Sequence, residues 1–201
     1  MISKRLFIAL AAVLLLAGCV GSPSQPTRFY MLSAGGAEQD GPPLSAGKAV
    51  LLGPVTLPGY LDRPQLVTHT SDNKLALSEL DQWAEPLHDN LKRVLIDNLS
   101  AALETEQVYA YPASLRPGPD VIQITLDIAE VRFSPTGDVS LKARWSLFNS
   151  LDGKPRLRDG KIYQSQNGGG HEDNAAALSN LVLELAGDLA TAARTVALAS
   201  S

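Results

Sequence analysis

Cysteine is almost missing from this sequence, with Cys19 as the only one among its 201 residues. A single thiol cannot close a disulfide within the chain. The fold must therefore be held together by side-chain packing alone, even if the protein resides in an oxidising compartment.

The short motifs that carry common enzyme chemistry are missing too. The chain has no G-x-S-x-G nucleophile elbow, no phosphate-binding P-loop and no H-E-x-x-H zinc motif. His69, His88 and His171 show no ligand spacing, and a zinc site needs three or four converging donors. The glycines at 168–170 lack the strand-to-helix context of a nucleotide loop and indicate a flexible linker. We therefore expect no enzyme, no metal site and no cofactor.

The one long apolar run lies at the start of the chain and is too short for a transmembrane helix. Lys4 and Arg5 precede it, and it spans Leu6–Leu16, whereas a membrane-spanning helix needs about 20 apolar residues. The next residues complete Leu-Ala-Gly-Cys, which matches the lipobox of bacterial lipoproteins. We predict a signal peptide over 1–18 and lipidation of Cys19. The alternative is an ordinary signal peptide followed by a chance cysteine.

The chain after the predicted cleavage site is an acidic, lipid-anchored domain. Acyl chains on Cys19, palmitate among them, would anchor it firmly, because each buried methylene contributes about 0.8 kcal/mol. Val20 rather than an aspartate follows, which favours the outer membrane by the enterobacterial sorting rule. Loss of two basic residues with the signal changes the net charge from −4 to −6, which argues against nucleic acid as a partner. Residues 19–27 form a short tether, and 28–201 are long enough for one domain with a core.

Two apolar stripes at the helical period predict two long helices. Pro86 suits the first turn of the first helix, where its missing N–H is not needed, and Glu85 adds negative charge near the positive helix end. Asp173 or Asn174 can cap the second helix. The stripes consist of Leu87, Leu91, Val94, Leu95, Leu99, Ala102 and Leu103, and of Leu178, Leu181, Val182, Leu185, Leu189, Ala193 and Val196.

Alternating apolar residues predict strands before each helix. Residues 121–133, 139–147 and 158–166 form an antiparallel meander, and a change of phase in the first of them predicts a β-bulge near 128–130. Shorter strands are expected at 28–32, 50–57 and 107–111, with a hairpin over 65–77. The predicted fold class is α/β of the α+β type: a single domain in which a mixed, mainly antiparallel sheet is covered on one side by two long helices.

The loop between Pro58 and Pro64 is the predicted partner-binding segment. Its prolines restrict the chain before binding, which lowers the entropy lost on association. The candidate contact residues are Tyr60, Leu61, Asp62 and Arg63, together with Trp83 from the sequence nearby. The structural alternative is that Tyr60 and Leu61 fold inward, that Asp62 pairs with Arg63, and that Trp83 fills the core.

Two segments of this region, PGYLDRPQLV at 58–67 and WAEPL at 83–87, resemble the ABC-type transport auxiliary lipoproteins, the PqiC/YmbA-like family. The start of the mature domain at 28–32 and the strand at 138–145 resemble it too, so the similarity covers nearly the whole chain. The order and spacing of these segments are more specific than either motif alone.

The resemblance implies an outer-membrane lipoprotein that faces the periplasm. It would serve a mammalian-cell-entry (MCE) type system that moves lipids between the two membranes and supports envelope integrity. A docking or end-piece role is implied, without ATPase activity, with an MCE-domain subunit as partner and a ring of copies as one assembly. The alternatives are a lipoprotein that itself binds a small hydrophobic ligand and an envelope hydrolase, which the missing nucleophile disfavours.

Overall fold

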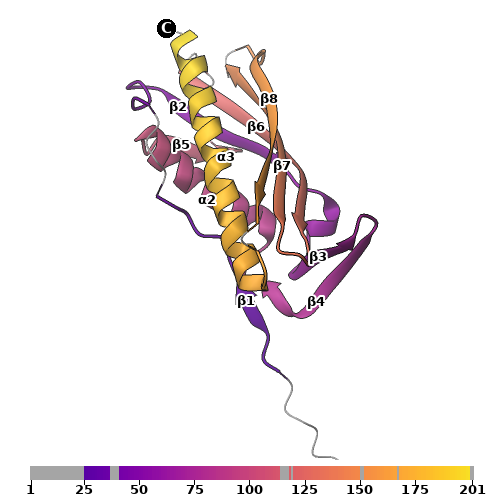
Figure 1. Cartoon of the computed structure of the whole chain (residues 1–201). Helices are drawn as coiled ribbons and strands as arrows, with labels where there is room; N and C mark the ends of the chain where they lie inside the picture. Colours follow the sequence, from indigo (N-terminus) through magenta and orange to yellow (C-terminus); the bar gives the residue numbers. More distant parts are fainter. Residues whose placement is uncertain are drawn as a thin grey trace, which may run out of the picture.

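A computed structural model describes residues 25–36, 41–113, 118, 120–149, 152–166 and 168–199. The predicted signal peptide and Cys19 lie outside these ranges. The elements are β1 (Arg28–Tyr30), β2 (Ala49–Thr56), a 3-10 turn η1 (Gly59–Leu61), β3 (Gln65–Ser71), β4 (Lys74–Trp83), α2 (Leu87–Leu103), β5 (Val108–Ala110), β6 (Val121–Phe133), β7 (Val139–Asn149), β8 (Pro155–Ser165) and α3 (His171–Ala199). They form a single α+β domain, which confirms the predicted fold class (Figure 1).

The larger sheet has five strands in the order β5-β2-β6-β7-β8. β2 runs parallel to both β5 and β6, whereas β6, β7 and β8 form the predicted antiparallel meander. The register between β6 and β7 shifts between Ile128 and Glu130, which confirms the predicted bulge. The bulge keeps apolar side chains on the covered face at both ends of β6, so Ile124 and Val131 are both fully buried.

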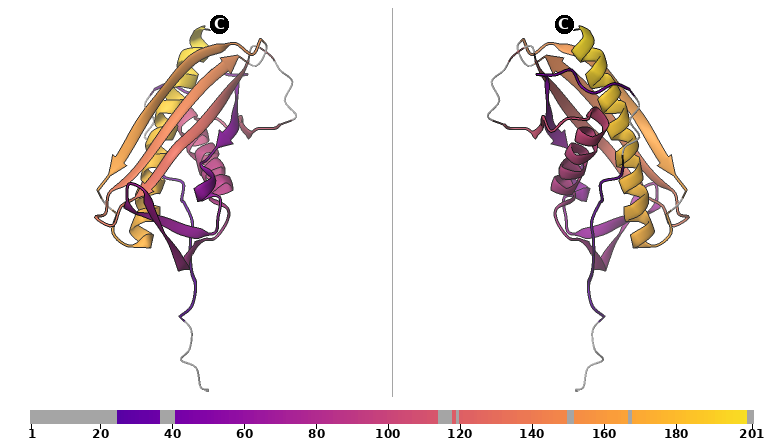
Figure 2. Two further views of the ribbon diagram at one scale, coloured as in Figure 1. Left: turned by 90° about the vertical axis from the view of Figure 1, so that its right-hand side faces the viewer. Right: turned by 90° about the vertical axis from the view of Figure 1, so that its left-hand side faces the viewer.

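Both helices pack on one face of this sheet, and the opposite face of β7 and β8 is left open (Figure 2). The apolar stripes face inward, and Leu95 and Leu185 are completely inaccessible to solvent. The cap of α3 differs from the prediction. The helix begins at His171, and Asp173 lies inside its first turn, where its Oδ2 accepts the Gly170 N–H at 3.1 Å.

The first strands form a separate three-stranded sheet in the order β1-β4-β3, where the sequence analysis expected one sheet. The cause is the turn at Pro58 and η1, which directs the chain away from β2 before β3 begins. β4 is also longer than the predicted hairpin strand. It continues to Trp83, whose N–H donates to the Pro64 carbonyl at 2.7 Å, and its last residues pair with β1.

Candidate functional site

The loop from Pro58 to Pro64 is a rigid turn at the junction of the two sheets. The Leu61 N–H donates to the Pro58 carbonyl at 2.9 Å and the Arg63 N–H donates to the Leu61 carbonyl at 2.9 Å. The Tyr60 hydroxyl donates to the Val131 carbonyl at 3.3 Å, which ties the loop to β6. These bonds fix the loop in one conformation without a partner.

The structure divides the five predicted contact residues between core and surface. Leu61 is 3% exposed and Trp83 is 5% exposed, and both belong to the hydrophobic core. Tyr60 is half-buried, with its ring edge-on to that of His69 at 5.9 Å. Asp62 is exposed, and it forms no ion pair with Arg63 in the described part of the chain. A surface role is therefore open only to Tyr60, Asp62 and Arg63.

Arg63 carries an unusual feature for a loop residue. Its Nε–H is buried and has no hydrogen-bond partner among the described residues. A buried donor without an acceptor is unfavourable by about 1–3 kcal/mol. Because the protein itself covers this atom, an acceptor from another chain could reach it only if the loop moved, so the unpaired donor alone does not assign a contact to Arg63.

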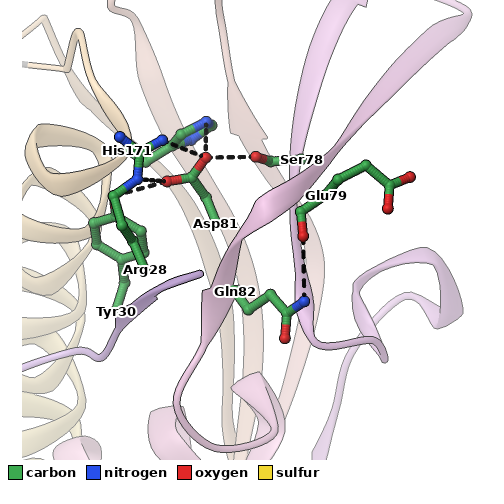
Figure 3. Close-up of polar contacts among 7 residues, drawn as sticks. All are labelled: Arg28, Tyr30, Ser78, Glu79, Asp81, Gln82 and His171. Atoms are coloured by element: carbon green, nitrogen blue, oxygen red, sulfur yellow. Dashed lines mark hydrogen bonds and ion pairs between the residues drawn. The ribbon is translucent and has the colours of Figure 1, made fainter. Parts of the chain in front are cut away.

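A buried carboxylate that sequence reasoning missed lies at the opposite end of β4 from the hairpin. Asp81, whose side chain is 4% exposed, accepts hydrogen bonds from the Arg28 Nε at 2.7 Å and Nη2 at 2.9 Å (Figure 3). The Tyr30 hydroxyl donates to it at 2.9 Å and the Ser78 hydroxyl at 2.6 Å. The His171 Nε2 lies 3.4 Å from the same carboxylate. These groups come from β1, β4 and the first residue of α3.

The donors around Asp81 outweigh its burial. Burial raises the pKa of this carboxyl, but the hydrogen bonds from Arg28, Ser78 and Tyr30 lower it more and hold the pKa well below its usual range. Burial, and then the bond to Asp81, raises the pKa of Tyr30. The carboxylate therefore stays ionised, and the cluster joins two strands of the smaller sheet, β1 and β4, to the start of α3.

The Asp81 cluster does not have the geometry of a nucleophilic site. The Ser78 hydroxyl donates its proton to the Asp81 Oδ2 at 2.6 Å, and the His171 Nε2 lies 3.4 Å from the same oxygen, so both groups are directed at the carboxylate and no hydrogen bond joins Ser78 to His171 among the described residues. The described residues also include no group of three or more His, Cys, Asp or Glu able to hold a metal ion. The geometry is that of a structural clamp.

Buried polar side chains hold the segment that follows β1. The Leu32 N–H donates to the Asn90 Oδ1 at 2.7 Å, the Ser33 N–H to the Ser179 Oγ at 3.2 Å and the Gly35 N–H to the Asn98 Oδ1 at 3.1 Å. The three acceptors lie on α2 and α3. They give this irregular segment the hydrogen bonds that a strand partner would otherwise supply.

The WAEPL segment supports the same region. Glu85 accepts hydrogen bonds from the Asn90 Nδ2 and, at 2.6 Å, from the Arg93 Nη2. Asn90 is thereby oriented to receive the Leu32 N–H. Asn90 and Asn98 are polar residues that lie beside the apolar stripe of α2. Their position next to this stripe is the one feature of the sequence that indicates their burial.

The three histidines lie in different parts of the structure and do not converge on one site. His69 is buried in β3, and burial followed by the nearby Arg132 charge lowers its pKa. The His88 ring lies 3.1 Å from the Val55 carbonyl, and His171 belongs to the Asp81 cluster.

Among the helices that the structure describes, none combines the length and apolar character that a membrane crossing needs.

Comparison with known proteins gives one consistent relationship. The family model of the ABC-type transport auxiliary lipoprotein component matches residues 30–190. The intermembrane transport lipoprotein PqiC of Escherichia coli (strain K12) is 28% identical over 144 residues, covering 72% of this chain and 74% of that protein. PqiC of Shigella flexneri gives the same values.

The fold recurs in solved structures of low sequence similarity. A crystal structure of a Xanthomonas campestris protein has a TM-score of 0.68 at 12% identity, covering 84% of this chain and 96% of that one. Another, of an uncharacterised protein, has a TM-score of 0.67 at 19% identity and covers 99% of that chain. The match to the family model extends from β1 into α3, and the chain therefore belongs to the ABC-type transport auxiliary lipoprotein component family.

Proposed function

We propose that this chain is the lipid-anchored, periplasm-facing subunit of an MCE-type intermembrane lipid transport system, with a docking or end-piece role at the outer membrane. The observation that carries the proposal is the family match over residues 30–190, together with the similarity to a lipoprotein named for intermembrane transport. In this role the chain supplies a rigid binding domain and no chemistry of its own.

The fold agrees with an anchored docking subunit. Residues 1–18 would be removed, Cys19 would carry the lipid, and residues 19–27 would connect it to β1. The Asp81 cluster holds β1, and the buried polar residues on α2 and α3 hold the segment after it. The start of the described domain is thus held to the core by hydrogen bonds at Arg28, Tyr30, Leu32, Ser33 and Gly35.

The described surface also agrees with a partner-binding role rather than a ligand-binding one. The groove over β7 and β8 is open to solvent. An isolated lipid needs an enclosed apolar cavity that covers most of its surface. A docking subunit needs an accessible face, and the uncovered side of the larger sheet provides one (Figure 2).

The test is extraction of the full chain in a mild detergent, followed by mass spectrometry of co-purified proteins and lipids. An MCE-domain subunit in the same complex supports the proposal. Co-purified lipid without such a subunit contradicts it and favours a lipoprotein that itself binds a hydrophobic ligand. Cys19→Ser should abolish lipidation and leave the protein uncleaved or released from the outer membrane, and Ser24→Ala is the matched control. Normal outer-membrane fractionation of Cys19→Ser would refute the anchor.

A further inference from the structure

The open face of the larger sheet has an ordered set of side chains. Cross-strand partners on this face are Lys142 with Ile162, Arg144 with Gly160, and Ser146 with Arg158. Side chains alternate along each strand, and the intervening residues of β7, Ala143 among them, are buried beneath α3. The six residues therefore share the uncovered side.

A groove of about 630 Å³ lies over this face. Gly160 leaves room for the start of the Arg144 side chain, since a Cβ on that glycine would come 3.0 Å from the Arg144 Cγ, and the Arg144 guanidinium then reaches Asp127 on β6. Ile162 is 54% exposed at one side of the groove. Methylene groups of the long basic side chains contribute further apolar surface, and their charged ends remain in water.

The groove is cationic although the whole chain is acidic. Arg144 is paired with Asp127 at 2.9 Å. Lys142 and Arg158 form no ion pair with any residue that the structure describes. Among the residues that line the groove, four are basic and one, Asp159, is acidic, in a chain of net charge −4. The two unpaired cations give the groove a preference for a negatively charged partner.

The neighbouring strand edge favours an extended partner. β8 is the outermost strand of the larger sheet and is 11 residues long. Extended segments of other proteins bind along such edges. A second copy of β8 is a poor partner, because it would bring another unpaired Arg158 to this edge, whereas its Arg156 and Lys161 are already paired with Asp152 and Asp188. An open groove also leaves an acyl chain exposed to water, so a protein segment fits better than a lipid.

We propose that an acidic, extended segment of another envelope protein binds along β8. Its carboxylates pair with Lys142 and Arg158, and an apolar side chain packs beside Ile162. This surface differs from the loop at Pro58–Pro64, and the inference goes beyond the proposed function, because it specifies the chemistry of the partner and not the system to which the partner belongs.

Photo-crosslinking in cells tests the proposal with the full chain. A benzophenone amino acid replaces Ile162, and the same amino acid at Leu198, which is 73% exposed on α3, is the control. The expected adduct from position 162 is a peptide of another protein with net negative charge. Adding Arg158→Glu should reduce its yield at least fivefold, whereas adding Lys74→Glu, an equal charge change at the start of β4, should leave the yield unchanged.

Several results would overturn the proposal. These are adducts only with a second copy of this chain, adducts only with lipid, a captured peptide without net negative charge, or no adduct at position 162. Equal loss in Arg158→Glu and Lys74→Glu would overturn it as well. Unchanged melting temperatures of both charge variants establish that the fold is intact. If an MCE-domain subunit co-purifies while position 162 gives no adduct, the inference fails and the proposed function stands.

Discussion

Asp81→Asn tests whether the buried carboxylate secures the first strand. The substitution keeps the volume of the side chain and removes its charge, so the bonds from Arg28, Tyr30 and Ser78 weaken. A hydrogen bond to a charged group contributes about 1.5–3 kcal/mol. Arg28 is 62% exposed, so solvent screens its contribution. The expected loss at neutral pH is about 1–3 kcal/mol, or about 2–4 °C in Tm per kcal/mol in a domain of this size.

The pH dependence gives the sharper result. The pKa of Asp81 is lowered in the folded protein, while the carboxyl has an ordinary pKa near 4 in the unfolded chain. Its contribution to stability is therefore complete above about pH 4 and is lost as the pH falls towards the folded-state pKa. The difference in the free energy of unfolding between wild type and Asp81→Asn should be large at pH 7 and should shrink below pH 4.

Urea unfolding followed by tryptophan fluorescence measures this difference at each pH. The control is Glu79→Gln, two residues away on the same strand, whose exposed side chain points away from the cluster (Figure 3). This variant should match the wild type within about 0.5 kcal/mol at every pH. A difference for Asp81→Asn that is absent at pH 7, or the same at pH 7 and pH 3, would refute the assigned role.

Three further predictions concern the core and the loop. Leu95→Asp should unfold the domain, because Leu95 is fully buried and an unpaired charge there is strongly unfavourable. Lys92→Ala should change the free energy of unfolding by no more than about 0.5 kcal/mol. Equal melting temperatures of the two variants would mean that α2 faces the other way. Leu61→Ala should lower stability by about 2–5 kcal/mol in chemical denaturation, and a silent result would contradict its place in the core. Arg63→Ala should leave Tm nearly unchanged and reduce co-purification of the partner, with Asp62→Ala as the neighbouring control; a fall in Tm with an intact complex would assign Arg63 a structural role.

The helices and strands in which apolar residues recur at a regular spacing could be predicted from the sequence. Both helices, the meander of β6 to β8 and the bulge at Ile128–Glu130 follow from the alternation of apolar residues, since a side chain's face is set by local geometry. The division into two sheets could not be predicted, because it depends on the direction in which η1 sends the chain. The burial of the Leu61 and Trp83 side chains in the core could not be predicted either. An apolar residue in or beside a proline-bounded loop is compatible with both a binding surface and a core.

The buried polar groups were missed for a different reason. Asp81, Asn90 and Asn98 have partners 53 to 63 residues away in the chain, and no short-range pattern encodes such pairs. Each of these three nevertheless acts on the segment from β1 to Gly35. Burial of a polar group is unfavourable unless the group is hydrogen-bonded. Buried Asp and Asn side chains are therefore expected only where a backbone N–H or a charged group has no other hydrogen-bond partner. Here that need arises because β1 has only three residues and pairs with a single strand, β4.

A strand of three residues forms too few ladder hydrogen bonds to hold the end of a domain by itself. Any force applied through the chain before residue 28 reaches the core through Arg28, which Asp81 holds by two hydrogen bonds. Behind it, Asn90 and Asn98 on α2 and Ser179 on α3 hold the next residues. If the clamp were lost, β1 would separate from β4 while the larger sheet and its helices kept their packing. Asp81→Asn should therefore increase hydrogen exchange at Tyr30 and Leu32 far more than at β6 and β7, and uniform loss of protection across the domain would show that the clamp supports the whole fold rather than the attachment of its first strand.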